Sequence, residues 1–142
     1  RQLDIQYIKG EYYSYSGKEQ INHLIYPVPG KLSLGLHATL DLGRGIKFGP
    51  SAVETKKLDY TVEEKNKMDF VKSLQQYWPS IQESNLSPDY SGIRAKIRGA
   101  EDFNIEKLDS KNKIAINIIG YISPGLTSSL ALGEKIANLV RS

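Results

Sequence analysis

The chain has 142 residues, of which 39% are hydrophobic and 25% are charged, and its formal net charge is +3. This composition is typical of one folded domain with a sizeable core, and it excludes a mainly disordered chain. The sequence contains no cysteine, which excludes disulfides and thiol catalysis and leaves histidine and carboxylates as the candidate metal ligands.

The charged and apolar residues narrow the expected partners further. Lysine and arginine are scattered along the chain and form no basic run interleaved with aromatics, so we expect no nucleic-acid partner. No apolar run approaches the roughly 20 residues that span a bilayer, so we expect no transmembrane segment. His23 and His37 lack the spacing of metal ligands, and we expect no metal site.

The first half of the chain has the pattern of an antiparallel sheet. Alternating apolar and polar residues predict strands over 2–8 and 11–17, a strand over 21–30 that ends in a proline-rich turn, and a long strand over 31–43. A turn and another short strand follow over 43–50. Turn residues recur about every 8–12 positions, which is typical of short strands joined in a meander.

An amphipathic helix is predicted over residues 61–78. Thr61 and Glu64 have the spacing of a capping box, in which each side chain satisfies a backbone N–H at the helix start. Pro79 is expected to end the helix. Apolar residues recur at helical spacing over this segment: Phe70, Leu74 and Tyr77.

The second half returns to strands and ends in a helix. The sequence predicts a strand over 87–99, a hairpin over 102–119 with its turn at 109–112, and a helix after the turn Ser123-Pro124-Gly125. The whole is therefore an α+β chain: a mostly antiparallel sheet with one central amphipathic helix and a C-terminal helix. We expect an antiparallel domain over 1–113 and a strand–turn–helix over 114–142.

Spacing alone leaves two readings for each candidate site residue. Arg94 shares a strand face with Gly92, where it could bind a carboxylate in bidentate fashion or lie solvated on the surface. His37 could accept a proton from a bound substrate or serve as a hydrogen-bonded structural histidine. The glycines of segment 43–49 do not fit a dinucleotide fingerprint, because the third glycine is one residue late and a strand follows; a β-turn is expected there.

Three stretches together resemble one family, in the same order along the chain. They are HLIYPVPGK with LGLHATLDLGRGIKFGPSAVE, then DYSGIRAKI, then GYISPGLTSSLA. On these stretches the chain resembles the C-terminal half of the L-2-hydroxyglutarate oxidases and dehydrogenases. These enzymes are FAD-dependent oxidoreductases of the D-amino-acid-oxidase and glycine-oxidase type.

The resemblance implies a complete enzyme with a Rossmann-like FAD domain and an antiparallel substrate domain that roofs the flavin. It implies that Arg94 binds the substrate carboxylate, that Tyr26 is a second substrate-binding residue, and that His37 is the catalytic base or a polar contact. The last strand and helix would return to the FAD domain, where backbone N–H groups and the helix dipole favour negative charge on the reduced ring. The residues implied to bind the cofactor are Ser123, Pro124, Gly125, Leu126, Thr127 and Ser128.

The sequence departs from the family in one large respect, because the GxGxxG turn and the ribose-binding acidic residue are absent. We therefore expect a fragment or split half of an enzyme that oxidises a 2-hydroxy acid such as L-2-hydroxyglutarate by hydride transfer to FAD. An FAD-domain half, in cis or in trans, would complete it, and the chain alone would be inactive. A cytoplasmic location is expected, peripheral to a membrane if a quinone accepts the electrons.

Two alternatives stay open at this point. The chain could be a decayed gene product. It could also be a non-enzymatic module that binds a carboxylate or a protein and self-associates as a homodimer through the wide apolar face of its last helix.

Overall fold

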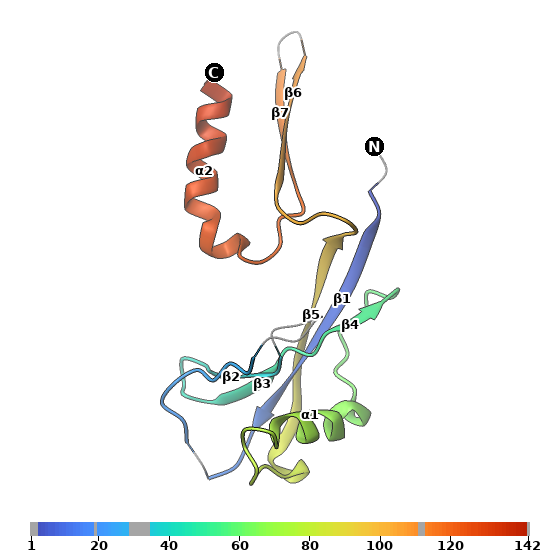
Figure 1. Ribbon diagram of the computed structural model, residues 1–142, viewed down its shortest axis with the longest axis vertical. Helices are drawn as coiled ribbons and strands as arrows, with labels where there is room; N and C mark the ends of the chain where they lie inside the picture. Colours follow the sequence, from blue (N-terminus) through green and yellow to red (C-terminus); the bar gives the residue numbers. More distant parts are fainter. Residues whose placement is uncertain (1–2, 19, 29–34, 111–112, 142) are drawn as a thin grey trace. The chain divides into compact units, whose positions relative to one another are not determined.

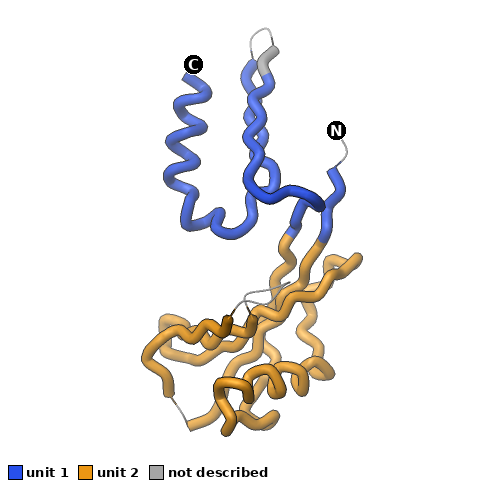
Figure 2. Tube along the Cα trace, viewed as in Figure 1, with its two compact units in different colours: residues 1–6, 95–142 blue, residues 7–94 orange. Residues whose placement is uncertain are grey.

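The computed structural model describes residues 3–18, 20–28, 35–110 and 113–141. The chain divides into two compact units, residues 7–94 (unit 2) and residues 1–6 with 95–142 (unit 1), coloured separately in Figure 2. From the sequence we predicted a different boundary, after residue 113, with residues 114–142 returning to an FAD domain. That boundary stays a prediction.

Unit 2 is built on a five-stranded sheet (Figure 1). The strand order is β2-β3-β1-β4, and β5 pairs with β1 as well. The pairings of β1 with β3, β1 with β4 and β2 with β3 are antiparallel. The strands are β1 (Ile5–Tyr15), β2 (His37–Leu40), β3 (Ile46–Gly49), β4 (Val53–Thr55) and β5 (Leu86–Ile97).

Strand β1 is one continuous strand, so the prediction of two strands over 2–8 and 11–17 is wrong. It pairs with β3 near its end and with β4 near its start. Gly10, which lies between these two stretches, is needed for close approach rather than for a turn: a Cβ on it would lie 2.8 Å from Cβ of Pro50. Nearby, the N–H of Glu11 donates to the Ser51 hydroxyl at 3.0 Å and keeps the two segments joined.

The loop before β2 corrects two further predictions. Within the described part of 21–30, only Ile25 bridges to a strand residue, Ala38, so this segment is not a strand. The strand predicted over 31–43 is limited to β2 as far as the structure describes it, and residues 29–34 lie outside the described residues. The turn expected over 43–49 is confirmed: the Asp41 carboxylate accepts the N–H of Gly45 at 2.8 Å, and β3 follows.

The central helix is shorter than predicted and is capped differently. A 3₁₀ turn (η1, Glu64–Asn66) leads into α1 (Lys67–Leu74), and no Thr61 capping box forms. The buried Glu11 carboxylate of β1 accepts the N–H of Glu63 at 3.4 Å and the Asn66 side-chain amide at 2.7 Å. The helix start is therefore fixed by a group distant in sequence, which a local pattern cannot reveal.

Helix α1 covers one face of the sheet and closes a core. The Tyr13 and Phe70 rings lie 4.5 Å apart between their centroids and join strand to helix. A second 3₁₀ turn, η2 (Glu83–Asn85), leads into β5. The buried hydrophobic residues are Tyr13, Ala38, Ile46, Phe48, Phe70, Val71, Leu74, Ile81 and Leu86.

Unit 1 contains the predicted hairpin and C-terminal helix. The hairpin pairs β6 (Asn104–Ser110) with β7 (Lys113–Ile119) in antiparallel register, and α2 spans Gly125–Arg141. These elements confirm the α+β fold class, while the short strand β4 was not predicted at all. Within the described ranges, no helix has the length and hydropathy needed to cross a bilayer.

Candidate functional site

The two faces of the unit 2 sheet differ in character. Side chains alternate along a strand, so Tyr13 and Phe48 enter the core while their neighbours Tyr12 and Lys47 lie on the opposite face. We call this opposite side the second face. It carries His37 and Arg94, two residues that the sequence analysis assigned to the substrate site.

A row of side chains crosses the second face from strand to strand. His37 of β2 pairs with Gly49 of β3. The ring of Tyr12 on β1 lies against Gly49, where a Cβ would be 2.6 Å from the ring, so only glycine leaves this space to the tyrosine. Tyr12 in turn stacks on Tyr90 of β5, with ring centroids 4.5 Å apart and planes 15° apart.

His37 and Tyr26, both singled out by the family resemblance, lie together. Their ring centroids are 4.1 Å apart, although Tyr26 belongs to the loop before β2 and not to a strand. His37 is 8% exposed, whereas Tyr26 is 55% exposed. The Tyr26 phenol is therefore exposed to solvent, while the His37 imidazole beside it is largely shielded from solvent. The roles assigned to the two residues stay predictions.

Arg94 is exposed on β5, four residues beyond Tyr90 and on the same strand face. Among the described residues its guanidinium has no hydrogen-bonded or ion-paired partner. Burial raises the pKa of Tyr12, and Tyr90 adds to the increase, while the positive charge of Arg94 lowers it. Tyr12 therefore lies within electrostatic reach of Arg94, so the structure connects the predicted arginine to the aromatic row.

A second cation borders the row but is already paired. The Lys47 ammonium lies 2.7 Å from the Asp89 carboxylate and 5.2 Å from the centroid of the Tyr90 ring. The hydrogen bond to Asp89 raises the pKa of Lys47. Because this ion pair neutralises Lys47, Arg94 is the better candidate for an incoming anion.

Sequence reasoning missed Tyr12 and Tyr90 as members of the cluster. Tyr12 stands in a cluster with Tyr13 and Tyr15, which spacing alone could not divide between core and surface. One signal was present: in a strand, Tyr12 and Tyr13 must face opposite sides. Which of the two faces the core depends on α1, which packs on one side only.

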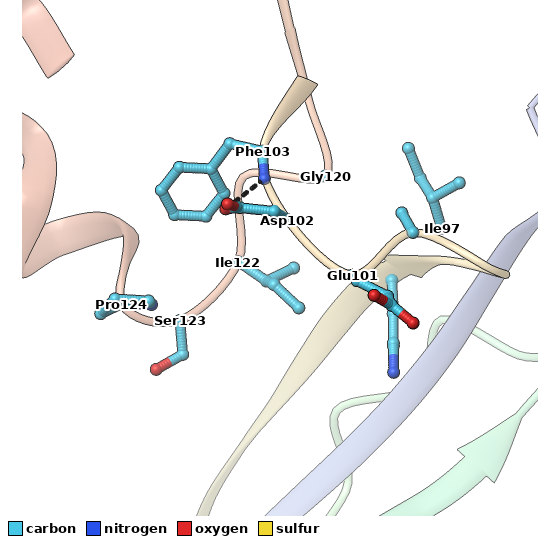
Figure 3. Close-up of a pocket in the computed structure, with 10 residues that line it drawn as sticks. Ile97, Glu101, Asp102, Phe103, Gly120, Ile122, Ser123 and Pro124 are labelled. Carbon is cyan, nitrogen blue, oxygen red and sulfur yellow. Dashed lines mark hydrogen bonds between the residues drawn. The ribbon is translucent and has the colours of Figure 1, made fainter. Parts of the chain in front are cut away.

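The residues predicted to bind the cofactor, 123–128, lie in unit 1, and we call them the cofactor cradle. Ser123 and Pro124 line a small cavity of about 110 Å³, shown in Figure 3 beside Asp102, Phe103 and Ile122. This volume is below the roughly 300–1,000 Å³ of pockets that enclose drug-sized ligands. Within unit 1, the cradle therefore encloses no complete ligand.

The start of α2 shows which groups of the cradle remain available. The first helical hydrogen bond runs from the N–H of Ser128 to the carbonyl of Pro124 at 3.0 Å. The Ser128 hydroxyl donates back to the same carbonyl at 3.1 Å, so it is turned into its own helix. The N–H groups of Leu126 and Thr127 have no partner in the described part of the chain, as expected for a first helical turn.

Comparisons with known proteins agree on one family. Residues 1–139 match the family of FAD dependent oxidoreductases. The chain is 37% identical to the mitochondrial L-2-hydroxyglutarate dehydrogenase of Arabidopsis thaliana, over 93% of this chain and 31% of that protein. It is 28% identical to an L-2-hydroxyglutarate dehydrogenase of Indibacter alkaliphilus, over 94% of this chain and 44% of the relative. The chain therefore spans less than half the length of these relatives.

A solved structure shares the fold. The dithionite-reduced L-alpha-glycerophosphate oxidase from Mycoplasma pneumoniae with FAD bound superposes with a TM-score of 0.79 at 20% sequence identity. The match covers 99% of this chain and 38% of the oxidase. At this identity the likeness concerns the fold alone.

Proposed function

The chain belongs to the FAD dependent oxidoreductase family, and on that premise we propose that it is the substrate-binding part of an enzyme that oxidises L-2-hydroxyglutarate or a similar 2-hydroxy acid. The observation that carries the proposal is the second-face cluster, in which an exposed arginine adjoins a row of aromatic side chains and a shielded histidine. Among the residues that the structure describes, this arginine has no anionic partner. The 37% identity to the Arabidopsis thaliana protein supports the choice of substrate.

FAD is the cofactor of this family, and the residues present suit one part of it. The N–H groups of Leu126 and Thr127 at the positive end of α2 would hold negative charge on the flavin ring. Segment 43–49 forms a β-turn and strand β3, so it offers no glycine-rich turn for the dinucleotide phosphates. We infer that the remaining contacts come from an FAD domain outside this chain. When bound, FAD supplies the acceptor for the hydride that leaves the substrate carbon.

Arg94 would bind and orient the substrate through its carboxylate. A guanidinium makes two parallel hydrogen bonds to a carboxylate, which defines the orientation of the molecule as well as its position. The stacked rings of Tyr12 and Tyr90 would form an apolar wall beside it, since their planes are only 15° apart. Together these groups would hold the substrate hydroxyl and its carbon in one defined place.

His37 would take the hydroxyl proton. Imidazole exchanges protons near neutral pH, which suits it to take a proton from a hydroxyl group. The Tyr26 ring, 4.1 Å from His37 between centroids, would restrict the orientation of the imidazole and exclude water from above it. The Tyr26 hydroxyl would then contact the substrate as well.

The decisive test is Arg94→Ala in the complete enzyme, meaning this chain together with its FAD domain. We expect kcat/KM for L-2-hydroxyglutarate to fall about 100-fold, mainly through KM, because a charge-assisted bidentate contact worth roughly 3 kcal/mol is lost. The kcat/KM of Arg94→Lys should lie between those of the wild type and Arg94→Ala, because an ammonium keeps the charge but cannot make the two parallel hydrogen bonds of a guanidinium.

Lys72→Ala is the matched control, because Lys72 is an exposed cation on α1, away from the second face. Its kcat/KM should equal that of the wild type. An unchanged kcat/KM in Arg94→Ala would remove Arg94 from the site and with it the proposed function.

A second candidate function is favoured by one observation on α2. Leu126 and Leu130 are 90% and 88% exposed. Under this alternative the isolated chain is a non-enzymatic module that self-associates by burying these side chains against a second copy. Light scattering of the purified chain separates the candidates, since a monomer at all concentrations contradicts self-association.

A further inference from the structure

Gly92 occupies a position on β5 that the fold itself does not explain. It lies between Tyr90 and Arg94 in the alternation of the strand, so all three belong to the second face. Its backbone is not in the left-handed region, and a Cβ built on it meets no heavy atom within 4 Å. Any small side chain would therefore fit here, and alanine would stabilise the strand relative to glycine.

Glycine inside a strand often marks a place where a ligand approaches the backbone closely. The neighbours of Gly92 suit such a ligand. On one side lies the Tyr90 ring, stacked on Tyr12, and on the other lies Arg94, whose guanidinium has no anionic partner among the described residues. The surface between the aromatic wall and the cation is thus bare backbone with open space above it.

We propose that Gly92 allows the substrate carboxylate to reach Arg94, because a glycine leaves the space between Tyr90 and Arg94 open. The inference rests on the proposed function and extends it to a residue that touches the substrate with its backbone. A side chain at position 92 would occupy the volume that the carboxylate needs in order to reach Arg94. Substrate affinity should therefore fall as that side chain grows, while the fold is unaffected.

The test uses the complete flavoprotein with Gly92→Ala and Gly92→Val. Binding of 2-oxoglutarate, lactate and glycolate is measured by isothermal titration calorimetry, and thermal unfolding is measured in parallel. We expect the Kd of 2-oxoglutarate to rise roughly tenfold with alanine and further with valine. The unfolding temperature should be unchanged or raised, because a strand glycine has been replaced.

Gly133→Ala is the matched control. It adds the same methyl group on α2, also with nothing within 4 Å, but far along the chain from the second-face cluster. Its Kd values should equal those of the wild type. In the Gly92 variants the Kd of all three ligands should rise, because each ligand carries the carboxylate that must reach Arg94.

The outcomes separate this inference from the proposed function. Wild-type protein that binds lactate or glycolate but not 2-oxoglutarate contradicts the proposed substrate. The role of Gly92 is then tested by the Kd of the ligand that does bind. Unchanged Kd values in both Gly92 variants overturn the inference. A Kd that rises only in step with a falling unfolding temperature also overturns it, because the role would then be structural. Wild-type protein that binds none of the three ligands overturns both proposals.

Discussion

The two units of this chain differ in how completely they bury their own apolar surface. Unit 2 closes a core in which Tyr13, Phe48 and Leu74 have no exposed surface. In unit 1, by contrast, Gly125 is the only buried residue among those described, and several large apolar side chains are exposed. Those of unit 1 are Leu3, Ile5, Leu108, Ile114, Tyr121, Leu126, Leu130 and Val140. Unit 2 also exposes large apolar side chains, among them Val28 and Leu42, so the difference lies in the buried core.

The difference shows what each unit needs in order to be stable. A sheet with a helix packed on one face buries enough apolar surface to fold as a unit. The hairpin and helix of unit 1 do not, since they bury no side chain among the described residues and an isolated hairpin is at best marginally stable in water. The chain spans less than half the length of its relatives. That its last strand and helix return to an FAD domain stays our prediction from the family resemblance. We therefore expect unit 1 to be completed by surface from outside this chain.

The largest expected effect tests the core of unit 2 directly. Phe48→Ala should lower the free energy of unfolding of unit 2 by about 3–5 kcal/mol, because it removes a fully buried aromatic ring and leaves a cavity. Ile118→Ala in the half-buried β7 should cost about 1 kcal/mol or less. Hydrogen exchange resolved by peptide measures both, since β1 and β3 report on unit 2 and β6 and β7 on unit 1. Equal losses in the two units would contradict the comparison.

The next effect concerns the buried carboxylate that holds the start of α1. Glu11 is 4% exposed, lies 3.2 Å from the Lys9 ammonium and accepts the Asn66 amide. Glu11→Gln should cost about 2–3 kcal/mol, because the ion pair is lost and Lys9 is left without its charge partner. Glu64→Gln is the control, because the Glu64 side chain that pairs with Lys67 is 65% exposed, and it should cost under about 1 kcal/mol. Chemical denaturation monitored by Trp78 fluorescence measures both variants.

A smaller effect is expected at high pH. Burial raises the pKa of Tyr13 to about 12, and its hydroxyl donates to the carbonyl of Glu63 at 2.6 Å. The unfolded chain therefore loses this proton near pH 10 while the folded chain keeps it, so stability falls as pH rises from about 10 to 12. Tyr13→Phe should be less stable at neutral pH and show a shallower fall. A denaturation midpoint with the same pH dependence in both proteins would contradict the prediction.

The smallest effect on stability is expected at the exposed surface of α2. Leu126→Ser with Leu130→Ser should change the free energy of unfolding of the chain by less than about 0.5 kcal/mol, because these side chains are almost fully exposed. The same variant should weaken association with an FAD domain or a second copy, since that surface would be buried on binding. Sedimentation with and without the partner measures this. A large loss of stability in the isolated chain would show that α2 is packed after all.

Some residues of the candidate site could be predicted from the sequence and others could not. Arg94, His37 and Tyr26 were named from the family resemblance, and the structure brings His37 and Tyr26 into ring contact. The Tyr12–Tyr90 stack was not predictable, because it depends on the pairing of β1 with β5 across a long sequence separation. The Asp89 partner of Lys47 was missed for the same reason.

The sequence by itself determined the elements whose signals are local. The β6–β7 hairpin, α2 and strand β5 follow from periodicity and turn residues within a few positions, and all three were predicted. Only the tertiary structure decided the rest. Gly10 continues β1 because Pro50 packs against it, and α1 begins late because Glu11 of β1 accepts the hydrogen bonds at its start. The physical reason is the same in both cases: a group distant along the chain supplies the contact, and it exists only once the sheet has formed.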